Sequence, residues 1–405
     1  MSRHAQDVLL EESFASLYMA LGANPGEAAE LRNYGDNRFD PAAASGLSFP
    51  LPDEAFVACW QKWENAARRR GAWEVLRAEL PQLAFPVREG ISKSSAYRAA
   101  TLKGVDPTSL DEATGLQLDD PSRLELELFE SPAGRVPVLR IQDSGRQEFV
   151  ALVRALSRRN EPATIPEAMG AQMLAGYNNW ARLHRLRRAW EATDPAERET
   201  ATWGEELRRI LPQKERYQDR FMILSDGPYS AVSAEELGLE EAEWRRKSFV
   251  IRRDHEAAHY FTRRVFGSMR NHLLDELIAD YAGIVAAEGR FRADWFLRFV
   301  GLDPRGHLLP EGRIAIYRGD PPLSDGAFAA LGRMMVRVAD HVQTFDRRAF
   351  DSAAGRGERT QTERAATFLA LAGLRLEELA ADKGATHLTG AYEAARTTLR
   401  DSADP

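Results

Sequence analysis

The sequence predicts a mainly helical α+β fold with a small sheet and a C-terminal helical subdomain. Apolar residues recur at helical intervals over most of the chain. Leu124, Leu126 and Leu128 instead alternate with glutamates, which is the period of a strand. A turn at 131–135 and an apolar run at 136–141 then predict a β-hairpin over 124–141. The last eighty residues contain long helical patterns and no strand signal.

Composition limits the class of protein. The chain has 405 residues, of which 44% are hydrophobic, so it can form a sizeable core and two or three domains. A formal net charge of −7 argues against a nucleic-acid binder. We find neither a signal peptide nor an apolar run long enough to span a membrane, and Cys59 is the single cysteine. We therefore expect a cytoplasmic protein without membrane or nucleic-acid partners, and the sequence leaves the oligomeric state open.

The remaining elements follow in chain order. We predict helices at 6–22, 24–32, 56–76 and 146–158, and over 167–192 either a long helix kinked at Gly176 or a broken pair of helices. We further predict an edge strand at 219–225, with an ordinary central strand as the alternative, and helices at 240–267, 273–288, 291–299 and 324–400. Pro137 suggests that the return strand of the hairpin also lies at a sheet edge. The segment 301–323 reads as a loop with one short strand, RIAIY. The prolines at 160–166 and the turn after 288 divide the chain into regions 1–160, 161–290 and 291–405.

The sequence His255-Glu256-Ala257-Ala258-His259 carries the clearest chemical signal. Histidines four residues apart lie one above the other on a helix, so both imidazoles can bind one metal ion. Glu256 projects away from them, where it can contact a water molecule without binding the metal. This spacing is typical of a catalytic zinc site.

A third metal ligand is available on the next predicted helix. Gly267 ends the first helix, and the polar link Ser268–Asn271 allows the chain to reverse. Glu276 on the second helix can complete the site. Asp280, one turn further on, can accept a hydrogen bond from the far nitrogen of a ligating histidine and so fix its tautomer.

These two helices resemble the motif helices of the gluzincin group of zinc metallopeptidases, of which thermolysin is the familiar member. The resemblance covers about forty residues and implies a zincin-like arrangement of the two helices. It implies that His255, His259 and Glu276 bind Zn²⁺, that Glu256 is the general base, and that Asp280 braces a histidine. An asparagine often precedes the third ligand in that group, and here the residue is Asp275.

Other interpretations of the motif remain. Glu256 and His259 also form the ExxH pair of di-iron proteins, but the chain has no second ExxH to complete such a site. Two histidines and one carboxylate can hold non-haem iron, although the helical spacing and Glu256 favour zinc hydrolysis. The plainest alternative is two surface histidines on a charged helix of a scaffold without metal.

The resemblance also directs attention to residues outside the motif. Peptidases of this group steady the oxyanion with a tyrosine or histidine, for which Tyr229, His307 and Tyr317 are candidates. They also pair an extended peptide substrate with an edge strand before the motif helix, and the predicted strand 219–225 has that position.

The favoured function is zinc-dependent hydrolysis of a peptide bond, with a peptide or protein as substrate. The region 161–290 is then the catalytic region. The alternative is a regulatory or partner-binding protein that keeps the zinc site without turnover. The sequence does not indicate which peptide is cut, nor whether the enzyme is an endopeptidase or an exopeptidase.

Overall fold

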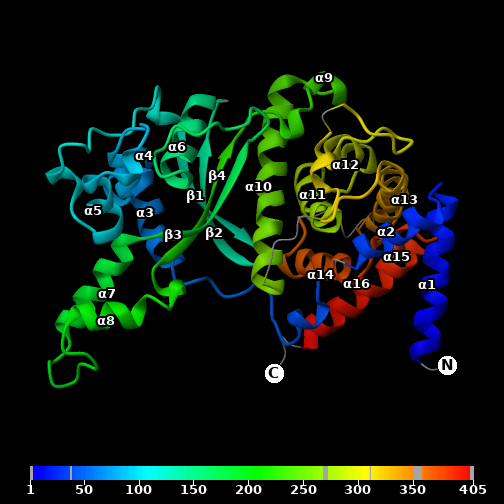
Figure 1. Ribbon diagram of the computed structural model, residues 1–405, viewed down its shortest axis with the longest axis horizontal. Helices are drawn as coiled ribbons and strands as arrows, with labels where there is room; N and C mark the ends of the chain where they lie inside the picture. Colours follow the sequence, from blue (N-terminus) through cyan, green and yellow to red (C-terminus); the bar gives the residue numbers. More distant parts are fainter. Residues whose placement is uncertain are drawn as a thin grey trace. The chain divides into compact units, whose positions relative to one another are not determined.

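The computed structural model describes residues 3–36, 39–143, 145–267, 272–310, 312–350 and 358–401. The chain is mainly helical and contains a four-stranded mixed sheet (Figure 1). It folds into two compact units, which we call the continuous unit, residues 52–227, and the split unit, residues 1–51 together with 228–405. This division differs from the three consecutive regions expected from the sequence, because the first 51 residues fold with the C-terminal part of the chain.

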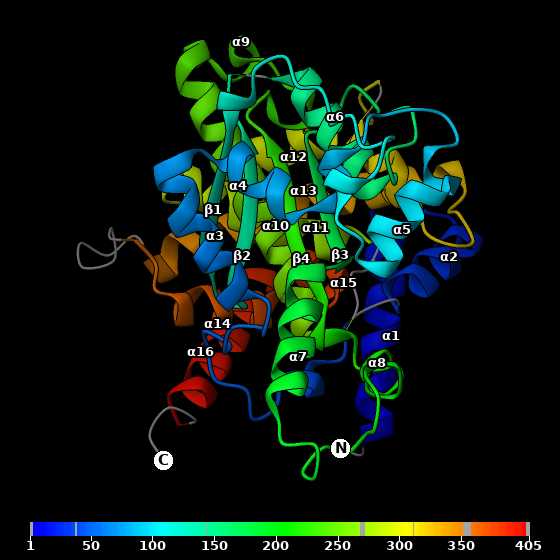
Figure 2. The same ribbon diagram turned by 90° about the vertical axis from the view of Figure 1, so that its left-hand side faces the viewer.

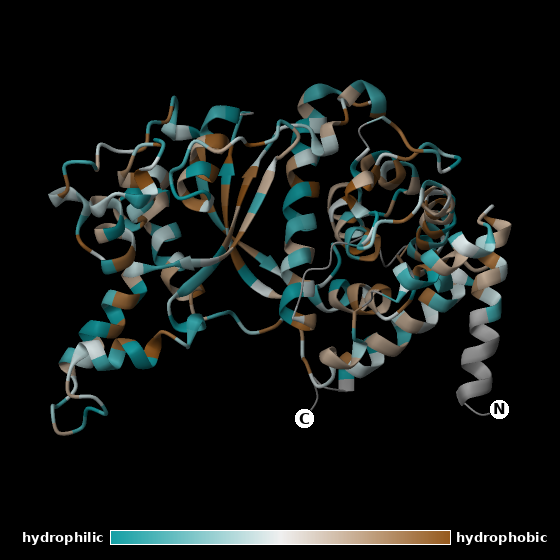
Figure 3. Cartoon of the chain, in the orientation of Figure 1, coloured by the Kyte–Doolittle hydropathy of each residue, from teal (hydrophilic) through white to brown (hydrophobic). Residues whose placement is uncertain are grey.

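The continuous unit contains the whole sheet. Its helices and strands are α3 Val57–Arg70, α4 Ala72–Glu79, α5 Ser95–Lys103, β1 Leu124–Ser131, β2 Gly134–Ile141, α6 Arg146–Ser157, β3 Ala171–Asn178, α7 Trp180–Ala192, α8 Trp203–Ile210 and β4 Gln218–Ser225. Helices α3, α4 and α6 share one hydrophobic core with alternate strand residues such as Leu139, Ile141, Phe221 and Ile223. Figure 2 shows α3 and α4 lying over β1 and β2, and Figure 3 shows hydrophobic residues recurring along the strands.

The strand order is β1-β2-β4-β3. The predicted hairpin is confirmed, since β1 and β2 pair antiparallel from Leu124–Ile141 to Ser131–Gly134. The predicted edge positions are wrong. Strand β4 lies between β2 and β3, and its run from Phe221 to Leu224 is buried. Strand β2 is also interior, and its parallel pairing with β4 begins at Val138, just after Pro137.

The predicted helix over 167–192 is also wrong in its first half. Residues Ala171–Asn178 form β3, an edge strand that pairs antiparallel with β4, and Gly176 lies at an irregularity in that pairing. Only Leu174 and Tyr177 are buried in β3, so the segment shows little strand alternation. Alanine, methionine, leucine and glutamine favour helices, and here pairing with β4 overrides that preference. Helix α7 begins only at Trp180.

Helices make up the split unit, apart from its loops and an isolated bridge between Leu302 and Leu308, in the part that the structure describes. Its α-helices are α1 Arg3–Ala20, α2 Pro25–Gly35, the short α9 Ala234–Leu237, α10 Glu241–Phe266, α11 Leu273–Glu288, α12 Ala293–Val300, α13 Asp325–Phe350, α14 Gln361–Ala372, α15 Leu376–Ala380 and α16 Gly384–Asp401, and its 3-10 helices are η1 Pro41–Ala44, η7 Tyr229–Ala231 and η8 Arg313–Tyr317. The expected C-terminal helices are therefore present. The segment RIAIY is η8 rather than a strand, since Ile314 and Tyr317, three residues apart, are its buried residues. None of the described helices combines the length and hydropathy that crossing a membrane requires.

Helices α10 and α11 carry the motif residues. Helix α10 ends at Phe266 and is capped by Gly267, which adopts a left-handed conformation with φ of 77°. The predicted polar link Ser268–Asn271 lies outside the described residues. Helix α11 begins after His272, whose Nδ1 accepts a hydrogen bond from the backbone N–H of Leu274. The Tyr34 ring on α2 stacks on His272 at 4.1 Å, so the N-terminal part of the chain helps to fix the start of α11.

The two motif helices approach each other closely at Gly283. A Cβ atom on Gly283 would lie 2.5 Å from the backbone oxygen of Ile251 on α10, which is well inside van der Waals contact. The absence of a side chain therefore permits the helix separation at which α11 can present residues to the histidines of α10.

Replacing Gly283 with alanine should therefore push the helices apart and destabilise the protein by about 1–3 kcal/mol, as overpacking in a core does. Thermal or denaturant unfolding measures the effect. The control is Gly390→Ala on α16, where nothing lies within 4 Å of the added methyl group, and alanine at this exposed position should stabilise the helix by up to ~1 kcal/mol. Equal effects of the two substitutions would contradict the close approach.

Candidate metal centre

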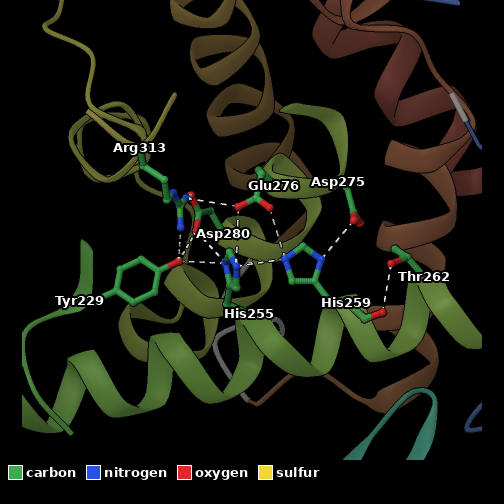
Figure 4. Close-up of polar contacts among 8 residues, drawn as sticks. All are labelled: Tyr229, His255, His259, Thr262, Asp275, Glu276, Asp280 and Arg313. Carbon is green, nitrogen blue, oxygen red and sulfur yellow. Dashed lines mark hydrogen bonds and ion pairs between the residues drawn. The ribbon is translucent and has the colours of Figure 1, made fainter. Parts of the chain in front are cut away.

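His255, His259 and Glu276 come together between α10 and α11. Each is only 5% exposed, and ligand atoms of the three lie within 4.8 Å of one another. Within the described ranges of the chain, no other group of three or more histidine, cysteine, aspartate or glutamate residues has such an arrangement. Figure 4 shows both imidazoles rising from α10 toward the carboxylate of Glu276.

The spacing of the three groups fits a single metal ion. The two Nε2 atoms are 3.1 Å apart. Glu276 places Oε1 3.4 Å from Nε2 of His259 and Oε2 3.7 Å from Nε2 of His255. Tetrahedral zinc with ligands at 2.0–2.1 Å has adjacent ligand atoms about 3.3 Å apart. The observed separations lie on both sides of that value.

The outer nitrogens of both histidines contact carboxylates. His255 Nδ1 lies 2.8 Å from Oδ1 of Asp280, and His259 Nδ1 lies 3.1 Å from Oδ2 of Asp275. A carboxylate accepts hydrogen bonds, so these contacts select the tautomers with a proton on Nδ1. Both Nε2 lone pairs then face each other and the carboxylate of Glu276. Glu276 Oε2 is buried and has no hydrogen-bond partner among the described residues, although it lies 3.6 Å from Nη2 of Arg313, so it can still accept a contact from a metal ion.

The electrostatics of the group are dominated by buried opposite charges. Burial lowers the pKa of His259, but the carboxylates of Asp275 and Glu276 outweigh burial and raise it well above its ordinary value. Burial raises the pKa of Glu276, whereas the hydrogen bond to His259 and the charge of Arg313 bring it below its usual range. Burial raises the pKa of Asp280, but the charge of Arg313 and the hydrogen bond and charge of His255 together outweigh burial and lower it overall. The lowered pKa values of Glu276 and Asp280 favour the charged form of both carboxylates.

Tyr229 and Arg313 complete the surroundings of Asp280. The Tyr229 hydroxyl donates to Oδ1 of Asp280 at 2.6 Å and lies 2.8 Å from Nδ1 of His255. Arg313 donates from Nη1 to the Tyr229 oxygen at 3.0 Å and from Nη2 to Oδ2 of Asp280 at 2.5 Å. Burial and the charge of Asp280 raise the pKa of Tyr229, so its hydroxyl keeps its proton and remains a donor.

Glu256 lies apart from this network. It is on α10 between the two histidines in sequence and is partly exposed. Its carboxylate forms no hydrogen bond or ion pair with any residue in the described part of the chain. The structure therefore gives this glutamate no partner that would explain it as a packing residue.

The three candidates for an oxyanion role have different surroundings. Tyr229 contacts Nδ1 of His255, the nitrogen that points away from the cluster, so its position suits bracing of the histidine. Tyr317 is buried, and burial together with the charge of Glu276 raises its pKa. His307 is exposed and its Nδ1 contacts Asp303 at 3.0 Å, a contact within its own loop.

Two contributing residues escaped the sequence analysis. Asp275 was noted only as a substitute for asparagine, and its contact with His259 depends on the rotation of α11. Arg313 lies in the segment interpreted as a loop with a strand, and no local pattern distinguishes it from the chain's other arginines. A carboxylate directly before a third metal ligand was the one signal available for Asp275.

The fold and the site together define a mainly helical protein with a candidate centre of two histidines and one carboxylate. The chain belongs to the family described as "Family of unknown function (DUF7005)", whose model matches residues 16–383. No curated protein and no solved structure matches the chain. The matched range includes every residue of the candidate centre.

Replacing Asp275 with asparagine should weaken Zn²⁺ or Co²⁺ binding by roughly 10–100-fold, because the amide leaves the proton position on His259 less strongly fixed. Competition with a coloured chelator measures the affinity. Asp325→Asn is the control, since that side chain is 99% exposed and contacts only Arg318 among the partners described. An unchanged affinity in the Asp275 variant would contradict the bracing role.

Proposed function

We propose that this protein is a zinc-dependent peptidase in which His255, His259 and Glu276 hold the metal and Glu256 is the general base. The observation that carries the proposal is the convergence of two Nε2 lone pairs and a carboxylate within 3.1–3.7 Å of one another. With each Nδ1 proton directed at a carboxylate, the three electron-rich groups can share either an additional proton on a histidine Nε2, in keeping with the raised pKa of His259, or a cation. A cation between them removes the repulsion.

The charge of the group supports a divalent cation. Asp275, Glu276 and Asp280 contribute three negative charges, and Arg313 contributes one positive charge. With neutral histidines, the buried group has a net charge of −2. Buried charges are stable only when they are compensated, and a dication gives compensation without further protons.

Glu256 supports a catalytic use of the metal. Bound zinc polarises water and lowers its pKa toward neutrality. A carboxylate that is free of other partners and partly exposed can take the proton from an attacking water and deliver it to the departing amine. The peptide or protein substrate and the zincin-like character of the two helices are parts of the same proposal.

A second candidate is a metal site with a purely structural or sensing role. The low exposure of the three ligand side chains, 7% or less each, favours it. A closed site, however, has no use for a base, and Glu256 is the residue that distinguishes the two functions. Metal analysis alone cannot separate them, whereas turnover can.

Purified protein should contain about one zinc ion per chain by elemental analysis, and His259→Ala should lose it, because two remaining ligands hold zinc weakly. His307→Ala is the matched control, as His307 is exposed and should not affect the metal content. Wild-type protein without a stoichiometric divalent metal, after refolding in the presence of zinc, would refute the site.

Glu256→Gln should keep the metal and lose turnover by roughly 10²–10⁴-fold, the usual contribution of a general base. Digestion of a broad peptide library, read by mass spectrometry, compares it with the wild type. Glu241→Gln, in the first turn of the same helix, should leave turnover unchanged. A wild-type protein that binds zinc and cuts no peptide would favour the non-catalytic candidate.

A further inference from the structure

The loop from Gly301 to Tyr317 brings one arginine into the candidate metal centre. We propose that Arg313 is a positioning residue, which fixes Asp280 and Tyr229 so that Asp280 holds His255 in the orientation that binds metal. This inference rests on the metal site of the proposed function. It adds a part of the chain outside both motif helices to the determinants of metal affinity.

Close backbone contacts fix the path of this loop. Gly301 lies against Gly312, where a methyl group on Gly301 would overlap the Cα atom of Gly312. Gly306 lies against α13, where a methyl group would come within 2.7 Å of the backbone of Gly332 and Arg333. The Leu309 N–H also donates to the Gly301 oxygen at 2.9 Å. Contacts between backbones leave little freedom, so the position of residue 313 is well defined.

The Arg313 side chain directs both terminal nitrogens into the site. Nη2 contacts Oδ2 of Asp280 and lies 3.6 Å from Oε2 of Glu276, while Nη1 contacts the Tyr229 hydroxyl. The guanidinium also lies over the Tyr229 ring, at 5.7 Å from its centroid. A planar guanidinium can serve an aspartate and a tyrosine at once because its donors have a fixed geometry.

This arrangement divides the two oxygens of Asp280 between different partners. Oδ2 accepts from Arg313, whereas Oδ1 accepts from Tyr229 and faces Nδ1 of His255. The Asp280 side chain has no solvent exposure, so water cannot replace a lost donor. Without Arg313, Oδ2 would be left buried and unpaired, and rotation of the carboxylate to recover a partner would take Oδ1 away from His255.

The positive charge of Arg313 has the opposite effect on a metal ion. Arg313 repels a nearby cation and so weakens metal binding. If Arg313 acted only through its charge, replacing it with a neutral residue would make the protein bind metal more tightly. Positioning and charge therefore predict opposite signs for the same substitution. This difference makes the proposal testable without measuring turnover.

The experiment measures the affinity of the full chain for Zn²⁺ by chelator competition, and the absorption spectrum of the Co²⁺ form. Arg313→Met should weaken Zn²⁺ binding by about 10–100-fold, the usual effect of losing an outer partner of a metal ligand. Arg313→Lys should recover only part of the loss, because one ammonium cannot serve Asp280 and Tyr229 together. Arg305→Met, an exposed arginine in the same loop, is the control and should bind Zn²⁺ like the wild type.

Tyr229→Phe provides a second, independent variant that keeps the ring and removes the hydroxyl. It should also weaken Zn²⁺ binding, and the double variant with Arg313→Met should lose less than the product of the two single losses, because both act through Asp280. The Co²⁺ spectrum should change in both single variants and remain unchanged in Arg305→Met.

The outcomes separate the two proposals. Unchanged or tighter Zn²⁺ binding in Arg313→Met, or full recovery by lysine, would overturn the positioning role while leaving the metal site intact. Absence of Zn²⁺ binding by the wild type would instead refute the proposed function. If Arg313→Met does not fold, wild-type affinity in both Arg313→Lys and Tyr229→Phe would equally overturn the positioning role.

Discussion

The candidate centre depends on two hydrogen bonds that lie on the side of the imidazoles away from the cluster. Asp280 and Asp275 each face an Nδ1 atom, and this selects which ring nitrogen carries the proton. Once both protons are on the outer side, the inner nitrogens are available as electron-pair donors at the same time. Four residues of the split unit, Tyr34, His272, Gly283 and Arg313, help to keep this arrangement in place.

Keeping three carboxylates inside a helical unit requires compensation, because each is stable as a charged group only with donors or cations nearby. Arg313 supplies a fixed positive charge and two directed donors. Gly283 allows α10 and α11 to approach each other closely, since a larger residue would separate the helices that carry the histidines and the carboxylates. Tyr34 and His272 fix the first turn of α11, from which Asp275 and Glu276 project. These contributions come from three separate parts of the chain, namely α2, α11 and η8.

Sequence reasoning found the parts of this design that are local. A sequence directly displays two histidines four residues apart, a glycine after the helix, and an ExxxD spacing on the following helix. His255, His259, Glu276 and Asp280 could therefore be predicted as site residues from the sequence. Arg313 was missed because its role comes from a loop path set by glycine contacts across the fold.

The sheet shows the same limit of prediction from local sequence patterns. The hairpin is local and was found, whereas the place of β4 depends on a parallel partner about eighty residues earlier, which no local pattern reveals. Strand β3 has helix-forming residues and few buried positions, so only its pairing with β4 defines it.

The split unit is formed by two separate stretches of the chain, and this affects how the protein folds during its synthesis. Residues 1–51 leave the ribosome before the helices with which they fold, which follow only after residues 52–227 have been synthesised. At ~5–20 residues per second, this delay is on the order of ten to forty seconds. During that time Tyr34 has no His272 to stack on, so the apolar side chains of residues 1–51 stay exposed on the nascent chain. The continuous unit has no such delay, because all of its residues are synthesised in one stretch.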